Sequence, residues 1–179
     1  MVPMDPSIFD VFLLDVDGVM TDGRFYYSSE GKVFKVFGAD DNDALSLVKP
    51  FVEIRFVSGD TNGFEISRKR IVDDMKYPLD LVSTLRRIDW IQARWSPQRV
   101  IYMGDGIFDH YVFRSVGYSI APANADDYTK QLATFVTRRS GGHRAVAEAC
   151  LHLLEKFYQP YNRDLLPLTS FPNGTPSTG

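Results

Sequence analysis

The fold of this chain is decided by a stretch near its beginning, which reads Val11-Phe12-Leu13-Leu14-Asp15-Val16-Asp17-Gly18. Its first four residues form a short, continuous apolar run, which is typical of a strand buried on both faces of a parallel sheet. The run ends in a turn that carries two carboxylates separated by one residue. Because ligands bind at the carboxyl ends of such strands, Asp15 and Asp17 are candidate site residues.

Two further polar turns follow apolar runs of the same kind. Ser58-Gly59-Asp60 comes directly after a predicted strand at 54–57, and Gly104-Asp105-Gly106 directly after one at 100–103. Taken alone, each turn is more often a helix cap or a plain loop. Their order, spacing and placement together predict that the three turns converge on one site at the same edge of the sheet.

Strand and helix patterns alternate along most of the chain, which predicts an α/β fold. We expect a Rossmann-like three-layer α/β/α sandwich with a mainly parallel sheet. A small β-hairpin insertion is predicted at about 24–37, where two strand-like runs flank a four-residue turn, Ser28 to Gly31. Further strands are predicted at 79–82, 118–120 and 135–136, and helices at 43–48, 64–75, from Ser83 or Thr84 to about Trp95, and 144–158.

The composition is that of a soluble globular protein, with 44% hydrophobic and 24% charged residues. The net charge of −3 gives no reason to expect nucleic acid or an anionic membrane as a partner. A single cysteine, Cys150, and the lack of a signal-peptide pattern predict a cytoplasmic location. We expect one domain at 1–158 and a flexible C-terminal tail at 159–179, rich in Pro, Gly, Ser and Thr.

The acidic turns suit phosphoryl transfer. Mg²⁺ prefers a few carboxylate oxygens and keeps water and substrate phosphate in its other positions. One carboxylate can act as the nucleophile and a second as general acid and base. The hydroxyl of Ser58 and the backbone N–H groups around Gly59 can bind phosphate oxygens, and Asp105 can complete the metal site.

The segment Asp15 to Gly23 resembles the first motif of haloacid dehalogenase-like hydrolases. Ser58-Gly59 resembles the second motif, and Gly104 to Asp109 the fourth. The likeness extends to the capless branch that includes 3-deoxy-D-manno-octulosonate 8-phosphate phosphatase. That branch has a DGxxY hairpin, here Asp22 to Tyr26, and a Gly-Gly segment before the last helix, here Gly141 to Val146.

The resemblance implies a role for each matching residue. Asp15 would be nucleophile and metal ligand, and Asp17 would be general acid and base and would ligate Mg²⁺ through its backbone carbonyl. Asp105 would be the third metal ligand. The implied substrate- and phosphate-binding set is Gly18, Ser58, Gly59 and Asp109, with Asp109 also supporting the loop of the fourth motif. The resemblance further implies a homotetramer in contact through the hairpin and no large cap domain.

The chain departs from this branch at three places. The family has a lysine before the fourth motif, but this region reads Ser83-Thr84-Leu85-Arg86-Arg87-Ile88. We expect Arg86 to replace the lysine, or Lys76 to reach in from the preceding loop. Asp40-Asp41 stands where the octulosonate phosphatases have Arg-Asp, and the fourth motif has Gly106 in place of an acid. Asp60 also stands where Arg is common, so the substrate is left open.

The sequence therefore favours a Mg²⁺-dependent phosphatase that hydrolyses a small phosphorylated metabolite, either a sugar phosphate or a sugar-acid phosphate. The reaction would pass through an aspartyl-phosphate on Asp15. The alternative is a non-catalytic oligomerisation module associated with sugar-nucleotide biosynthesis, which the missing lysine motivates. Phosphoryl transfer to an acceptor other than water is less favoured, because no cap excludes water.

Overall fold

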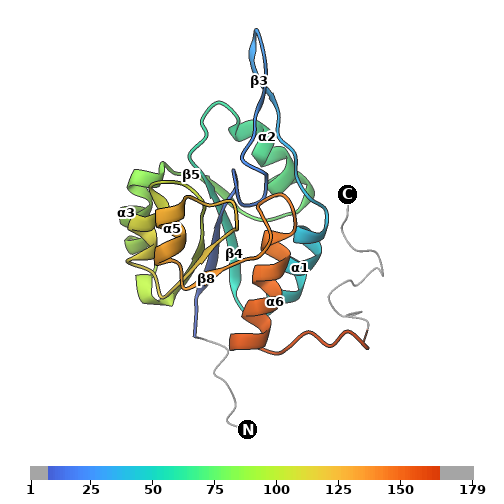
Figure 1. The fold of residues 1–179 in the computed structure, drawn as a ribbon, viewed down its shortest axis with the longest axis vertical. Helices are drawn as coiled ribbons and strands as arrows, with labels where there is room; N and C mark the ends of the chain where they lie inside the picture. Colours follow the sequence, from blue (N-terminus) through green and yellow to red (C-terminus); the bar gives the residue numbers. More distant parts are fainter. Residues whose placement is uncertain (1–7, 166–179) are drawn as a thin grey trace.

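The structure, a computed structural model, describes residues 8–165. One sheet lies between two layers of helices, and a two-stranded hairpin projects beyond this body (Figure 1). The expected three-layer α/β fold is confirmed. Of the predicted tail, residues 159–165 contain no helix or strand, and 166–179 lie outside the described residues.

The sheet has six strands, and every pairing in it is parallel. Its order is β5-β4-β1-β6-β7-β8. The chain first adds β4 and β5 on one side of β1, and then crosses over to add β6, β7 and β8 on the other side. This reversal creates a topological switch point beside β1, where ligands bind in open α/β sheets. The strands are β1 (Val11–Asp15), β4 (Glu53–Ser58), β5 (Leu79–Leu81), β6 (Val100–Met103), β7 (Tyr118–Ala121) and β8 (Phe135–Val136).

Helices cover both faces of the sheet, and none of those described is long and apolar enough to cross a bilayer. One face carries α1 (Asp40–Val48), α2 (Phe64–Arg68), the π-helix η1 (Lys69–Asp74) and α6 (Ala145–Phe157). The other carries the 3₁₀ turn η2 (Thr84–Arg86), α3 (Arg87–Gln92), η3 (Pro97–Arg99), α4 (Asp109–Phe113) and α5 (Asp127–Leu132).

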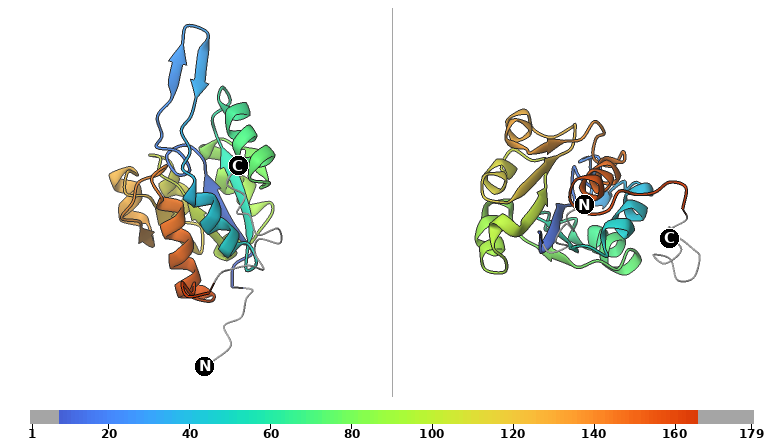
Figure 2. Two further views of the ribbon diagram at one scale, coloured as in Figure 1. Left: turned by 90° about the vertical axis from the view of Figure 1, so that its right-hand side faces the viewer. Right: turned by 90° about the horizontal axis from the view of Figure 1, so that it is seen from below.

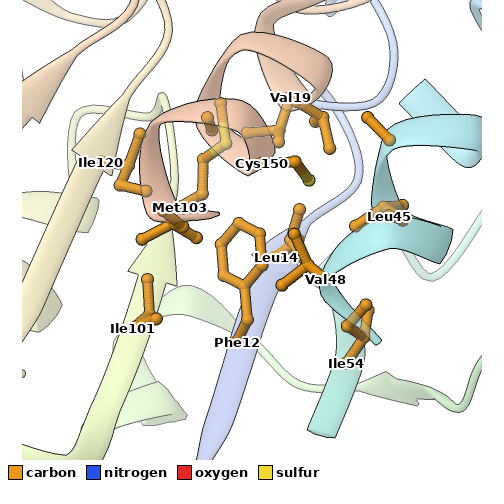
Figure 3. Close-up of a cluster of buried hydrophobic side chains, with 14 of the residues drawn as sticks. Phe12, Leu14, Val19, Leu45, Val48, Ile54, Ile101, Met103, Ile120 and Cys150 are labelled. Atoms are coloured by element: carbon orange, nitrogen blue, oxygen red, sulfur yellow. The ribbon is translucent and has the colours of Figure 1, made fainter. Parts of the chain in front are cut away.

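Alternate side chains of β1 supply the two halves of the core. Phe12 and Leu14 pack beneath α1 and α6, close to the buried thiol of Cys150, as Figure 3 shows. Val11 and Leu13 point to the opposite face, towards α3 and α4. Each of these four side chains is fully buried, which stabilises the fold by about 2 kcal/mol per side chain. The central strand is therefore held firmly on both faces, and so is the turn that follows it.

The hairpin consists of β2 (Tyr26–Ser28) and β3 (Gly31–Phe34), and it stands clear of the sheet in Figure 2. Its strands include Ser28 and Gly31, so the turn is two residues long and not the predicted four. An antiparallel bridge between Thr21 and Phe37 closes its base. Between β1 and β4 the chain holds only this hairpin and α1, which confirms that no large cap domain interrupts the fold there.

Two predicted helices differ from those observed. The helix expected at 64–75 is α only as far as Arg68 and then widens into η1. The helix expected to begin at Ser83 or Thr84 starts with the 3₁₀ turn η2, and regular α geometry begins only at Arg87. Because a 3₁₀ turn has fewer residues per turn than an α-helix, it changes which side chain faces the sheet.

Candidate active site

Three neighbouring strands bring the predicted polar turns together. Asp15 is the last residue of β1, Ser58 is the last residue of β4, and Asp105 lies two residues beyond the end of β6. Since β1 pairs with both β4 and β6, the three turns lie at the same edge of the sheet, as expected. Carboxylate oxygens of Asp15, Asp105 and Asp109 lie within 4.8 Å of one another.

A buried arginine holds the carboxylate of Asp15. Arg87, the first residue of α3, donates from Nη1 to Oδ2 of Asp15 at 2.8 Å and from Nη2 to Oδ1 at 3.1 Å. The backbone N–H of Val16 donates to the same Oδ1 at 2.8 Å. Arg87 is 1% exposed and also contacts Asp109 and the hydroxyl of Tyr102. The bidentate geometry therefore fixes the plane of the Asp15 carboxylate and compensates its charge.

The structure thus places Arg87, and not the expected Arg86 or Lys76, against Asp15. The side chain of Arg86 is 79% exposed and pairs with Asp89. Lys76 is exposed and donates to the backbone carbonyl of Asp73. The cause is the 3₁₀ turn η2, which turns Arg86 towards solvent before α3 begins.

A signal for Arg87 is present in the sequence. Ile91 is buried against the sheet, and Arg87 precedes it by four residues, so the two share a helix face. Arg86 does not share that face. The periodicity of the apolar residues could therefore have distinguished the two adjacent arginines.

Asp105 lies among negative charges. Burial and the charges of Asp15 and Asp109 raise the pKa of Asp105 to about 8. The oxygens of Asp109 are already occupied, because Oδ1 accepts from Tyr102 and Arg87 and Oδ2 accepts from the backbone N–H of Gly106. Asp15 lines the cleft while it keeps its contacts with Arg87 and Val16, and Asp105 lies close to it, so these two carboxylates form an oxygen-rich donor set that fits a hard divalent ion.

Asp17 is directed away from this cluster and towards the hairpin. Its Oδ2 accepts a hydrogen bond from Nζ of Lys35 at 2.9 Å, and Nζ lies 2.8 Å from Oδ1. Burial raises the pKa of Asp17, although Lys35 opposes the shift. Neither Lys35 nor its neighbour Lys32 was among the predicted site residues, because no spacing rule connects a hairpin lysine with a strand-end aspartate.

An open cleft of about 400 Å³ lies over Asp15 and Asp17. One wall comes from the hairpin, through Phe25 and Lys32, and the opposite wall from the η2 turn and Phe108. The residues that line it are Asp15, Asp17, Phe25, Lys32, Gly59, Asp60, Ser83, Thr84, Leu85, Arg87 and Phe108. The cleft is thus charged at its floor and apolar on parts of both walls.

The remaining predicted residues occupy different positions around this cleft. Gly59 lines it, whereas Ser58 is fully buried beneath it and its Oγ accepts from the backbone N–H of Asp60 at 3.1 Å. Gly18 lies against Asp105. Asp109 is 1% exposed and supports the loop of the fourth motif from behind Asp15, so it does not line the cleft.

Known proteins resemble this chain in both sequence and structure. A family model for haloacid dehalogenase-like hydrolases matches residues 84–149. The 3-deoxy-D-manno-octulosonate 8-phosphate phosphatase KdsC of Yersinia pestis is 29% identical over 150 residues, which cover 78% of this chain and 76% of that protein.

Among solved structures, a Streptomyces avermitilis protein described as a HAD family hydrolase superposes with a TM-score of 0.74 at 25% identity. The match covers 92% of this chain and 95% of that one. The cobalt-bound deoxy-D-mannose-octulosonate 8-phosphate phosphatase of Haemophilus influenzae has a TM-score of 0.71 at 25% identity. That match covers 84% of this chain and 90% of the other. These findings confirm the resemblance that the motifs indicated.

Proposed function

We propose that this chain, which resembles haloacid dehalogenase-like phosphatases in sequence and structure, hydrolyses the monophosphate of a small sugar or sugar acid, with Asp15 as nucleophile. The observation that carries this proposal is the position of Asp15 at the floor of an open cleft, with its carboxylate held by Arg87. A nucleophile fixed in this way needs little further ordering before it attacks.

The two carboxylates of the first motif take different parts in the proposed reaction. Asp15 attacks phosphorus, the bond to the leaving oxygen breaks, and Asp17 gives its proton to that oxygen. Asp17 then removes a proton from water, which displaces phosphate from Asp15. Burial, which raises the pKa of Asp17, favours the protonated form that the first step requires.

Arg87 has a double task in this mechanism. Its guanidinium neutralises Asp15, which lets a negatively charged phosphate approach the nucleophile. Its five donors leave capacity for a phosphate oxygen, the part that lysine has in the related enzymes. The backbone N–H groups near Gly59, which lines the cleft, would bind a second phosphate oxygen.

A divalent cation, which we propose to be Mg²⁺, fits the donor set of this site. Asp15, Asp105 and the backbone carbonyl of Asp17 would hold it. When bound, it would neutralise the negative charge that develops on the transferred phosphoryl group. The cobalt-bound relative supports a divalent ion in proteins of this kind.

The walls of the cleft support a small polar substrate with some apolar surface. Phe25, Leu85 and Phe108 offer apolar contacts, while Lys32 and Asp60 offer a donor and an acceptor for hydroxyl groups. A sugar or sugar acid has this combination. Asp40 and Asp41 do not line this cleft, because Asp40 pairs with Arg144 and Asp41 is buried, so the choice between a sugar and a sugar acid stays open.

We also propose that the chain forms a homotetramer through its hairpin. Large apolar side chains are exposed there, including Tyr26, Tyr27, Phe34 and Val36, and a surface of this kind is typical of a protein contact. Light scattering coupled to gel filtration would measure the mass, and a monomer at micromolar concentration would contradict this proposal. A cytoplasmic location stays a prediction from the sequence.

The alternative of a non-catalytic oligomerisation module rested on the missing lysine. Arg87 weakens that argument, because it supplies a buried cation to Asp15. A module without catalysis would have no use for a buried arginine that holds an acid at the floor of a cleft.

The test is phosphate release from a panel of sugar phosphates, sugar-acid phosphates and nucleotides, with Mg²⁺ or with a chelator. We expect Mg²⁺-dependent release from one class, abolished by Asp15→Asn. Full activity of Asp15→Asn, or release that is independent of a divalent ion, would contradict the proposed mechanism. No release from any compound, by a folded sample that binds Mg²⁺, would favour the oligomerisation module.

A further inference from the structure

The ammonium group of Lys35 is enclosed by acceptors from three parts of the chain. Its side chain is 0% exposed. Nζ lies 2.8 and 2.9 Å from the two oxygens of Asp17, 2.8 Å from Oδ2 of Asp60 and 2.8 Å from Oγ of Ser67. An ammonium has three N–H donors, so these three residues satisfy it completely. The arrangement joins the hairpin, the catalytic turn after β1 and the loop after β4.

The surrounding structure leaves room for this lysine. A Cβ atom on Gly63 would lie 2.8 Å from Cε of Lys35 and 2.7 Å from Cδ of Lys32. The ring of Phe25 covers the pair, with its centroid 3.4 Å from Nζ of Lys32 and 5.4 Å from Nζ of Lys35. Glycine at position 63 and the aromatic ring together form a compartment around the stems of the two lysines, while Lys32 also lines the cleft.

Anchoring the hairpin does not by itself require Lys35. Lys32 already pairs with Asp60, and it does so without contact with Asp17. Burying a second ammonium costs several kcal/mol unless each of its contacts is good, so an apolar side chain would anchor the hairpin at lower cost. What Lys35 adds is a hydrogen bond to Oδ2 of Asp17 and a close charge contact with Oδ1, which together restrict the rotation of that carboxylate about its side-chain bonds.

We propose that Lys35 is a positioning residue that holds the carboxyl group of Asp17 in line with the leaving oxygen of the substrate. The inference rests on the proposed function, in which Asp17 delivers the proton to that oxygen. A misplacement of about 1 Å at a reacting group can cost roughly 100-fold in rate. The hairpin is therefore part of the catalytic machinery of its own chain.

Two aryl phosphates distinguish positioning of an acid from a purely structural role. p-Nitrophenyl phosphate has a leaving group that departs with little protonation, whereas phenyl phosphate has the same ring but a more basic leaving oxygen. We expect Lys35→Met to lower kcat/KM about 100-fold for phenyl phosphate and less than about 10-fold for p-nitrophenyl phosphate. Asp17→Asn removes the acid itself. The ratio of its losses for the two substrates is therefore the largest ratio expected for Lys35→Met.

Lys32→Met is the matched control, because it removes a buried lysine from the same compartment without touching Asp17. Its effect should be equal for the two aryl phosphates. Equal losses for both substrates in Lys35→Met would overturn the proposal and leave Lys35 as a structural anchor. If Lys35→Met does not fold, as judged by thermal unfolding, Lys35→Gln retains a donor without the charge and replaces it in the comparison.

A crystal structure of the Lys35 variant supplies a readout that is independent of activity. We expect the carboxylate of Asp17 to be rotated in the Lys35 variant relative to the wild type. In Lys32→Met we expect this carboxylate to keep its wild-type orientation. An unmoved Asp17 would refute the positioning role even if the wild-type chain hydrolysed neither compound. Failure of the wild-type chain on the whole phosphate panel would instead contradict the proposed function, so the two failures are distinguishable.

Discussion

Gly18 and Asp105 approach so closely that a Cβ atom on residue 18 would lie 1.9 Å from Oδ2 of Asp105. The backbone of Gly18 also has a φ of +84°, a conformation that glycine adopts at no steric cost. The first motif therefore needs glycine at this position for two reasons, and one of them is the carboxylate that is proposed to complete the metal site.

Replacing Gly18 by alanine should displace Asp105 and weaken metal binding by about 10- to 100-fold, as losses of groups that support a metal site do. Gly23→Ala is a matched control. Gly23 has a φ of +79° and thus the same backbone strain, but a Cβ there would meet only atoms of Gly18, at 3.4 Å or more. Titration calorimetry with Mg²⁺ alone measures the difference. Equal affinities for the two variants would mean that Asp105 does not contribute to the metal site.

Arg87→Met should lower phosphate release at least 100-fold, because the nucleophile loses its fixed orientation and the approaching phosphate loses its cation. Arg86→Met should stay within about twofold of the wild type, since its side chain lies in solvent. The rates are compared at saturating Mg²⁺ on the substrate that the panel identifies.

The Arg87 variant also carries a cost in stability. Asp15 and Asp109 would remain buried without their partner, which destabilises a protein by about 3–5 kcal/mol. Thermal unfolding shows whether Arg87→Met is folded at the assay temperature. If it is not folded, Arg87→Lys, which preserves the charge, replaces it in the assay. Wild-type rates in a folded Arg87→Met would exclude a role for this arginine in catalysis.

Gly63→Ala should destabilise the chain, because the new Cβ would lie within 3 Å of atoms of Lys32, Lys35 and Asp60. Overpacking of this kind costs about 1–3 kcal/mol and should lower Tm by several degrees. Gly59→Ala is the control, since a Cβ there would meet its neighbours at ordinary distances of 3.7 Å or more. Calorimetry measures the Tm of both variants. A Tm of Gly63→Ala equal to that of Gly59→Ala would show that the compartment around the two lysines has room for an added methyl group.

Asp41→Asn should stabilise the chain at neutral pH. Asp41 is 1% exposed, and burial raises its pKa to about 6 from 3.8. Because the folded state holds this proton more tightly, the wild type loses stability as pH rises from about 4 to 6, by roughly 3 kcal/mol in all. Oδ1 of Asp41 accepts a hydrogen bond from the backbone N–H of Ala147 at 2.9 Å. Asparagine retains an acceptor for this hydrogen bond but cannot ionise.

Urea unfolding of the wild type and of Asp41→Asn between pH 4 and pH 7 tests this expectation. The free energies of unfolding of the two proteins should coincide near pH 4, and the difference between them should grow up to about pH 6. Asp40→Asn, from the same helix turn, is the control for removing an exposed carboxylate, since Asp40 is half exposed in its pair with Arg144. A constant difference between wild type and Asp41→Asn at every pH would rule out ionisation of Asp41 as the cause.

Much of the molecule follows from local sequence patterns. The apolar run before Asp15 specifies a central buried strand, and similar runs before Ser58 and Gly104 specify its two neighbours. Parallel pairing then forces the turns after these strands to one edge of the sheet. The motif residues Asp15, Asp17 and Asp105 could be predicted for this reason, because each lies within two residues of a strand end.

Only the tertiary structure decided which basic side chains complete the site. Arg86 and Arg87 are adjacent in sequence, and a single 3₁₀ turn determines that Arg87 reaches Asp15, 72 residues away. Lys35 reaches Asp17 from the base of the hairpin, where Gly63 leaves space for its stem. Local periodicity determines which residues form strands and helices. The residue at which a helix begins, and the space available to a distant side chain, depend on contacts between segments far apart in the chain. These contacts form only on folding.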